Sequence, residues 1–211
     1  MSNRPVYTIL FMLIASLGSF VIFSLIFNPL GFVSYFGFPD GNKGNLFSWF
    51  LALVVVVAYS ASCAKISDVK YYMFKLDTLK VVAIVAAIFA GIVEEIVFRK
   101  WIMDYLASKE YGVVVQVVLS GLAFGLAHLM WGVKTFAAGF NAVLSTSLLG
   151  MALAVIYLVG DRSLLPCIVA HLLITALIEP GLIIAAANDK IGYWSEKTNK
   201  SMQPTAKASA D

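Results

Sequence analysis

The residues of this chain with the clearest capacity for chemistry are two adjacent carboxylates and an arginine inside an apolar stretch, "GIVEEIVFRKW" at 91–101. Glu94, Glu95 and Arg99 interrupt a run that otherwise has the composition of a membrane span. An ionisable group at the centre of a membrane helix costs about 2.5 kcal/mol or more, so such groups usually face the protein interior and mark a site. Two histidines, His128 and His171, complete the set of ionisable groups that we identify within the apolar runs.

The two carboxylates should have separate roles. On an α-helix Glu95 and Arg99 are four residues apart, which places them on one face in the order that favours an ion pair. Glu94 points about 100° away from Glu95 around the helix axis. We therefore predict a structural pair of Glu95 with Arg99 and a Glu94 that is free for chemistry.

Spacing along the chain also suggests that three of these groups share one depth in the membrane. If the third and fourth apolar runs form a hairpin, Glu94 and His128 both lie about 21–23 Å from its turn, at about 1.5 Å of rise per residue. His171 lies about 14 Å below the short connection that precedes its own run. We therefore expect Glu94, His128 and His171 in a single layer.

One carboxylate and two imidazoles in one layer suit two kinds of chemistry. Glu94 could act as the general base on a water that His128 helps to hold, while His171 stabilises the oxyanion of an attacked carbonyl. The same three side chains could equally bind a divalent metal such as zinc, because three nitrogen or oxygen ligands plus water describe a catalytic zinc site. Taken singly, a buried Glu–Arg pair is more often a structural clamp, and a lone histidine a core residue. Their occurrence together favours a site.

The composition requires a membrane to surround these residues. The chain has 61% hydrophobic and 13% charged residues and a mean hydropathy of +0.89, against an apolar fraction of about one half in soluble domains. We expect an all-α polytopic transmembrane helix bundle of about six spans, with the active site inside the membrane. The spans are predicted at 6–27, 46–64, 79–98, 113–130, 139–159 and 163–187.

The bundle is expected to form one transmembrane domain at 1–187, with a motif-bearing core at 79–175. The polar, small-residue-rich segment 188–211 is predicted to be a disordered tail. The first run lacks a clear cleavage site and is interpreted as a retained span. Most lysines fall on the side of both termini, which predicts cytoplasmic termini by the positive-inside rule. The bilayer is the expected partner, whereas the absence of a basic block with aromatics argues against nucleic acid; the oligomeric state stays open.

Three motifs in order resemble a known family. "EEIVFR", with Glu94, Glu95 and Arg99, is similar to its EExxxR motif, and "FGLAH", with Phe124 and His128, is similar to FxxxH. "GDRSLLPCIVAHLLIT" resembles the third motif, led by a histidine. The chain thus resembles the CAAX protease and bacteriocin-processing (CPBP) family of intramembrane proteases, also called the type II CAAX prenyl endopeptidase or lysostaphin-resistance-like family, from about Leu79 to Thr175.

The resemblance implies a membrane endopeptidase in which Glu94 and His128 activate water. It further implies that His171 and the residue four positions later, Thr175, form the oxyanion hole, with Glu95, Arg99 and Phe124 in support. The family often has asparagine where this chain has Thr175, and a hydroxyl reaches less far than an amide. Glycine is frequent where this chain has Lys100.

The resemblance does not fix the substrate; we expect a membrane-associated protein or peptide, processed in a prokaryotic inner membrane. No cofactor is certain, and a divalent metal remains the alternative. A different class of function is a catalytically inactive scaffold or regulator of the same fold, for example in bacteriocin self-immunity. A proton-coupled carrier would use the same buried carboxylate, but the chain shows no internal repeat of the kind that transporters have.

Overall fold

The computed structural model describes residues 4–38, 41–129 and 136–188. All regular elements in these ranges are helices, which confirms the expected all-α class. The tail at 188–211 lies outside the described residues apart from Asn188, so its disorder remains a prediction. The longer helices are α1 (Arg4–Phe27), α3 (Leu46–Cys63), α5 (Thr78–Glu95), α7 (Val113–Ala127), α8 (Phe136–Val159) and α9 (Leu165–Ile178). The shorter ones are α2 (Pro29–Ser34), α4 (Ser67–Tyr72), η1 (Ile96–Met103), α6 (Asp104–Ser108) and α10 (Gly181–Ala187).

Side-chain caps begin several of these helices where the sequence turns from polar to apolar. The Asn45 side chain accepts a hydrogen bond from the Ser48 backbone N–H at 2.9 Å at the start of α3. The Asp77 carboxylate accepts one from the Lys80 N–H at 2.9 Å at the start of α5. Each cap satisfies a backbone donor that has no partner within the helix, which fixes where the helix begins.

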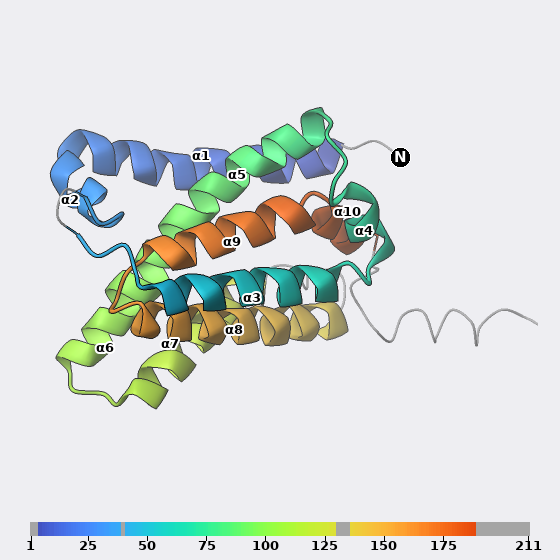
Figure 1. Cartoon of the computed structure of the whole chain (residues 1–211). Helices are drawn as coiled ribbons and strands as arrows, with labels where there is room; N and C mark the ends of the chain where they lie inside the picture. Colours follow the sequence, from blue (N-terminus) through green and yellow to red (C-terminus); the bar gives the residue numbers. More distant parts are fainter. Residues whose placement is uncertain (1–3, 39–40, 130–135, 189–211) are drawn as a thin grey trace, which may run out of the picture.

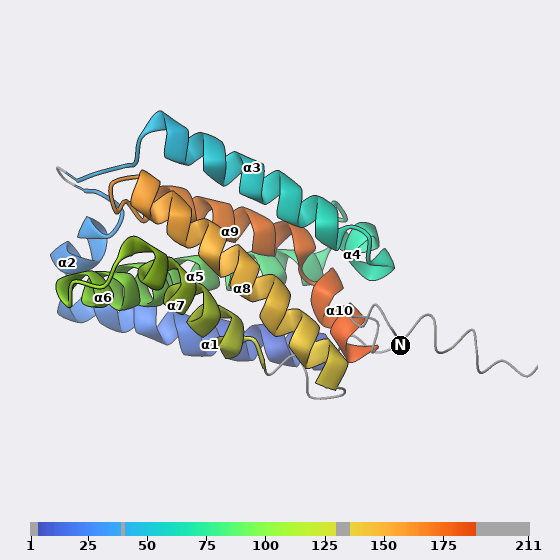
Figure 2. The ribbon, with the colours of Figure 1, turned by 90° about the horizontal axis from the view of Figure 1, so that it is seen from below.

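Helix α9 is the central element of the bundle. It packs against α5 on one side and α3 on another, and it also contacts α8. Figure 1 shows α9 running between α5 and α3, with α1 beyond α5. The view from below in Figure 2 places α1 and α3 on opposite sides of the bundle. Because α9 carries His171 and α5 carries Glu94, the packing of these two helices builds the interior of the site.

Among the described residues, fewer helices qualify as membrane spans by length and composition than the six that we expected. Four of them are long and apolar enough to cross: Arg4–Phe27, Leu46–Cys63, Thr78–Ser108 and Phe136–Val159. A fifth span results if α9 and α10, which are bent by 56°, are taken as one broken span. The segment predicted as a span at 113–130 forms a helix only over Val113–Ala127, and its 15 residues rise about 22 Å, less than the roughly 30 Å of a hydrocarbon core.

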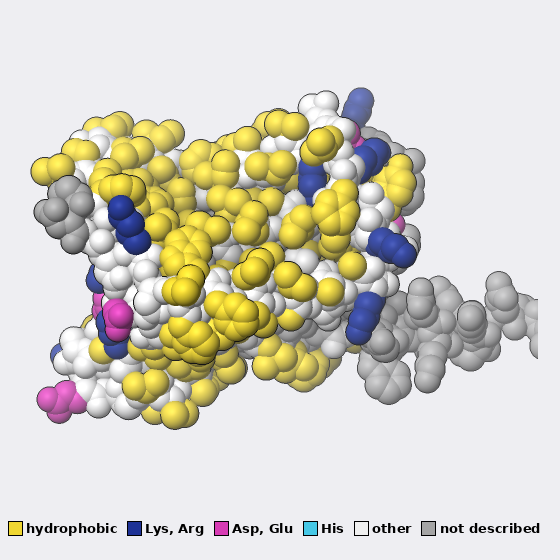
Figure 3. All heavy atoms as spheres, viewed as in Figure 1, with side chains coloured by type: hydrophobic (Ala, Val, Ile, Leu, Met, Phe, Trp, Pro, Cys, Tyr) yellow, Lys and Arg dark blue, Asp and Glu magenta, His cyan; other side chains and the backbone are white. Residues whose placement is uncertain are grey.

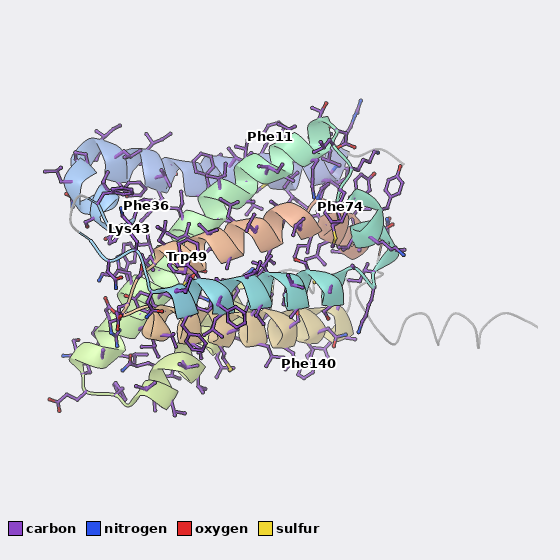
Figure 4. The ribbon with its side chains drawn as sticks, in the orientation of Figure 1. Phe11, Phe36, Lys43, Trp49, Phe74 and Phe140 are labelled. Atoms are coloured by element: carbon purple, nitrogen blue, oxygen red, sulfur yellow. The ribbon has the colours of Figure 1, made fainter. Side chains whose placement is uncertain are left out.

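The outer surface of the bundle is suited to lipid. Exposed large hydrophobic side chains occur on every long helix, and Figure 4 shows Phe11, Phe74 and Phe140 at the periphery, where they are 56%, 80% and 55% exposed. In Figure 3 the flank is largely hydrophobic, and Lys and Arg side chains lie at the two ends of the bundle, including the end that carries α4, on the right. The protein is therefore an integral membrane protein whose charged side chains lie at the ends of an apolar flank.

Two glycines allow α7 and α8 to approach closely. A Cβ atom on Gly150 would lie 3.0 Å from the Cα of Gly121, and a Cβ on Gly121 would lie 2.9 Å from the backbone nitrogen of Met151. Small residues at such a crossing let two membrane helices pack backbone to backbone. This packing holds Phe124, on α7, against the interior.

Substitution of Gly121 by alanine should therefore destabilise the bundle by about 1–3 kcal/mol, because the new methyl group must displace the α8 backbone. The measurement is the free energy of unfolding in mixed micelles. Gly112→Ser is the matched control, since a Cβ at Gly112 meets no atom within 4 Å and serine is a favoured N-cap residue. Equal stability of the two variants would contradict the close α7–α8 contact.

Candidate active site

The helix that carries the acidic motif changes its winding at the site. Helix α5 ends at Glu95, and the next eight residues, Ile96–Met103, form a π-helix before α6 continues the same span. Short π-helical segments within α-helices occur frequently at functional sites. Glu94 and Glu95 thus lie in the last α-helical turn, and Arg99 lies in the wider turns that follow.

Glu95 and Arg99 form the predicted ion pair at the centre of the protein. The Arg99 Nε lies 3.0 Å from the Glu95 Oε2, and both side chains are fully buried. The guanidinium also donates from Nη2 to the Gly150 carbonyl at 3.1 Å and lies over the Phe124 ring, 4.9 Å from its centroid. Arg99 therefore connects η1 to α7 and α8, and its charge is balanced by Glu95.

Glu95 has a second partner that the sequence analysis did not assign to it. The His171 Nδ1–H donates to the Glu95 Oε1 at 2.7 Å, so one carboxylate binds the arginine through one oxygen and the histidine through the other. A carboxylate on one ring nitrogen fixes the tautomer and orientation of an imidazole. The other nitrogen, Nε2, then lies 3.8 Å from the Glu94 Oε2, which is longer than a hydrogen bond.

Glu94 lies beside this assembly and makes no direct bond within it. Its side chain is 22% exposed, yet its Oε2 is buried and has no hydrogen-bond partner among the described residues. The backbone near it is tightly packed, because a Cβ at Gly91, one turn before, would lie 3.2 Å from the Leu172 nitrogen of α9. The geometry thus agrees with the prediction that the two carboxylates differ. Glu95 is bound to Arg99 and His171, whereas the Glu94 Oε2 has no hydrogen-bond partner among the described residues.

His128 lies next to the Phe124 ring and makes no direct bond to Glu94 among the described residues. Helix α7 ends at Ala127, so His128 is its C-cap, and the His128 Nδ1–H donates to the Phe124 carbonyl at 2.8 Å. The Phe124 ring stands next to both imidazoles, with centroid distances of 4.7 Å to His128 and 5.5 Å to His171. Within the described residues His128 makes no hydrogen bond or ion pair with Glu94. The expected span ran to residue 130, whereas α7 ends at Ala127 and His128 is its C-cap.

This arrangement does not fit the metal alternative. Among the described residues, no three His, Cys, Asp or Glu side chains gather in a way that could hold a metal ion. The set Glu94, His128 and His171 therefore does not form a three-ligand site, and no step below depends on a metal.

Two further buried ionisable residues were missed: Glu179, which interacts with Glu94, and Lys80, near the other end of α5. Glu179, just after α9, is buried, has an Oε2 without a hydrogen-bond partner among the described residues, and interacts electrostatically with Glu94 and His171. The ammonium of buried Lys80 donates to the backbone carbonyls of Leu177 at 3.0 Å and Glu179 at 2.6 Å, closing the end of α9. Both residues fall within predicted spans, 79–98 and 163–187, so a full inventory of charges in the apolar runs would have found them.

Thr175 lies one helical turn after His171 on α9, as its spacing predicts. The side chain is half-buried, and its hydroxyl has no hydrogen-bond partner in the part of the chain that the structure describes. A free hydroxyl on the same helix face as an imidazole can serve as a second donor to one ligand atom.

The fold and the site together define a polytopic helical membrane protein with a buried Glu–Arg–His assembly and an adjacent free carboxylate. Residues 77–177, somewhat less than half of the chain, match the family described as type II CAAX prenyl endopeptidase Rce1-like. The matched segment begins at the cap of α5 and ends just before Glu179, and it includes every predicted site residue. No curated protein and no solved structure matches the chain.

Proposed function

We propose that this protein is an intramembrane endopeptidase that hydrolyses a peptide bond of a membrane-associated protein or peptide. The observation that supports this function best is the position of Glu94. A buried carboxylate oxygen of Glu94, which has no hydrogen-bond partner among the described residues, lies 3.8 Å from the His171 imidazole, and Glu95 holds that imidazole in place. The match to a family of prenyl endopeptidases agrees with protease activity.

In the proposed reaction Glu94 is the general base. It removes a proton from a water molecule as the water oxygen attacks the peptide carbonyl carbon, and it later returns that proton to the amine that leaves. A general base must have a lone pair that no other donor occupies, and the Glu94 Oε2 meets this condition among the described residues. His128 has its Nδ1–H committed to the Phe124 carbonyl, so its Nε2 has an unshared lone pair with which to orient the same water.

His171 and Thr175 are proposed to stabilise the oxyanion of the tetrahedral intermediate. Since the His171 Nδ1–H is donated to Glu95, its Nε2 faces the reacting side and acts as a donor when protonated. The Thr175 hydroxyl supplies a second donor one turn away. Glu95 and Arg99 do not touch substrate in this account; they hold His171 in its orientation.

A substitution at Thr175 tests its proposed role as an oxyanion donor. Thr175→Val keeps the side-chain shape and removes the hydroxyl, so we expect kcat to fall by about 10²-fold, the lower end of the effect of losing one oxyanion donor. Thr8→Val is the matched control, because Thr8 makes only a local bond to the Arg4 carbonyl on α1. An unchanged kcat in Thr175→Val would remove Thr175 from the oxyanion hole.

The charge distribution supports a location and an orientation. Lys65, Lys70 and Lys75 lie at the α4 end of the bundle, near the start of α1. By the positive-inside rule we propose that this end, with both termini, faces the cytoplasm, in a prokaryotic inner membrane. The proposed substrates are peptides of the bacteriocin-like or signalling type.

The proposed function is tested with purified full-length protein in liposomes and a library of membrane-associated fluorogenic peptides. We expect cleavage by the native protein. The loss of cleavage should be much smaller in His128→Ala than in Glu94→Gln, because the Glu94 carboxylate, 3.8 Å from His171, is the proposed base and His128 only helps to orient the water. A native protein that cleaves no peptide, together with a Glu94→Gln variant that keeps full function in cells, would instead indicate a catalytically inactive scaffold.

A further inference from the structure

A second polar cavity lies at the end of the bundle opposite to α4. It is partly open and has a volume of about 190 Å³. Side chains from four separate segments line it, and none of the acidic or imidazole groups of the candidate active site is among them. The lining residues are Ser34, Tyr35, Gly37, Asn42, Lys100, Arg162, Ser163 and Leu164.

The cavity has a net positive charge, and its two cationic side chains, Lys100 and Arg162, are positioned by ion pairs and hydrogen bonds. Lys100 Nζ lies 2.9 Å from Asp104 Oδ2, and Arg162 Nη1 donates to Asp104 Oδ1 at 2.6 Å. Arg162 also donates from Nη2 to the Gln116 Oε1 at 2.8 Å. One carboxylate thus balances two cations, and both cations keep further N–H donors for a ligand.

Hydrogen bonds with Asn42, which lies across the cavity, fix the backbone around Arg162. The Asn42 amide donates to the carbonyls of Gly160 at 2.9 Å and Asp161 at 2.8 Å, while the Ser163 hydroxyl donates to the Asn42 carbonyl at 2.8 Å. Arg162 itself has a left-handed backbone with φ of 62°, a conformation that costs energy in a residue other than glycine. Tyr35 adds a hydroxyl that has no hydrogen-bond partner within the described residues.

The setting of the cavity is that of a membrane–water interface. Two aromatic residues that follow Lys100 on the same span are exposed, Trp101 at 47% and Tyr105 at 62%. Figure 4 shows Phe36, Lys43 and Trp49 at the same end of the bundle. Tryptophan and tyrosine side chains concentrate at the headgroup level of a bilayer. An anion that reaches this cavity is therefore most available from the lipid headgroups.

We propose that this cavity binds a phosphate group, with the phosphodiester of an anionic phospholipid headgroup as its source. Arg and Lys side chains are the usual ligands of phosphate oxygens, through charge-assisted hydrogen bonds. Basic pockets between membrane helices bind lipid headgroups in the same way. The volume corresponds to about six water molecules at roughly 30 Å³ each, which is room for a phosphate and part of its glycerol. The proposal also gives Lys100 a role where the related motif often has glycine.

The test measures thermal unfolding of the full-length protein in detergent as a short-chain lipid is titrated. The probes are dihexanoyl phosphatidylglycerol, dihexanoylglycerol without phosphate, and inorganic phosphate. Lys100→Gln is the main variant, because its ammonium is partly exposed and makes one ion pair. Lys109→Gln, at the nearby end of α6, changes the net charge equally and is the matched control.

We expect phosphatidylglycerol to raise the unfolding temperature of the native protein and of Lys109→Gln, and dihexanoylglycerol to have no effect. Lys100→Gln should need about tenfold more phosphatidylglycerol for the same shift. An equal shift with inorganic phosphate, weakened in the same way by Lys100→Gln, would keep the phosphate site and identify free phosphate as its source. The proposal would be overturned if phosphatidylglycerol stabilised Lys100→Gln as well as the native protein. It would also be overturned if Lys109→Gln and Lys100→Gln lost the same amount of this stabilisation. These readouts do not depend on peptidase activity.

Discussion

Replacement of Glu94 by glutamine should reduce peptide cleavage by about 10²–10⁴-fold, the usual contribution of a general base. Glutamine has nearly the same shape but cannot accept the proton of the attacking water. Because the Glu94 Oε2 has no hydrogen-bond partner among the described residues and lies 3.8 Å from His171 Nε2, the substitution breaks no hydrogen bond of that oxygen, and the free energy of unfolding should change little. The measurement is kcat/KM on a cleavable peptide together with the thermal unfolding curve.

Glu110→Gln is the matched control for that experiment. Glu110 is an exposed residue of the turn between α6 and α7, so its substitution removes the same charge away from the site. Full activity in Glu110→Gln with loss in Glu94→Gln would assign the effect to the site. Substantial cleavage by Glu94→Gln would show that another group activates the water.

The second large effect is expected for Glu95, whose two oxygens have different partners. Loss of one member of a buried ion pair costs about 3–5 kcal/mol, because the remaining charge is left without a counter-ion. Glu95→Gln should therefore strongly destabilise the protein. The double variant Glu95→Gln with Arg99→Met should recover most of the loss, since neither charge of the pair remains.

Measurements of activity distinguish the two roles of Glu95, which are its ion pair with Arg99 and its hydrogen bond with His171. In Glu95→Gln with Arg99→Met the amide oxygen can still accept the His171 Nδ1–H, whereas Glu95→Leu with Arg99→Met has no acceptor. The glutamine double variant should be about 10–100-fold more active than the leucine one, as for other groups that orient a functional histidine. Both are measured for cleavage and for unfolding in mixed micelles. Equal activity in the two would show that the bond between Glu95 and His171 is not needed for turnover.

Much of this architecture could be predicted because it depends on local spacing. Apolar runs gave the helical membrane fold, and the four-residue separation of Glu95 and Arg99 gave their ion pair, which the structure contains. The 100° offset of Glu94 likewise predicted a carboxylate apart from that pair. These inferences need only the geometry of one helix.

The remaining features depend on how helices end and pack, which spacing does not reveal. His128 was placed by assuming that α7 continues to residue 130, but the helix ends at Ala127. The bond between His171 and Glu95 joins two helices and required their packed positions. The π-helix from Ile96 and the break after α9, which buries Glu179, leave no periodic signal in the apolar composition.

The most direct test of the account is cleavage in ¹⁸O-labelled water, with the products analysed by mass spectrometry. Native protein in liposomes, with a membrane-associated peptide and with or without a chelator, should yield a product that carries one ¹⁸O in its new carboxyl group, and Glu94→Gln should yield almost none. Hydrolysis that persists in Glu94→Gln, or that stops when the chelator is added, would contradict a water activated by Glu94 without a metal.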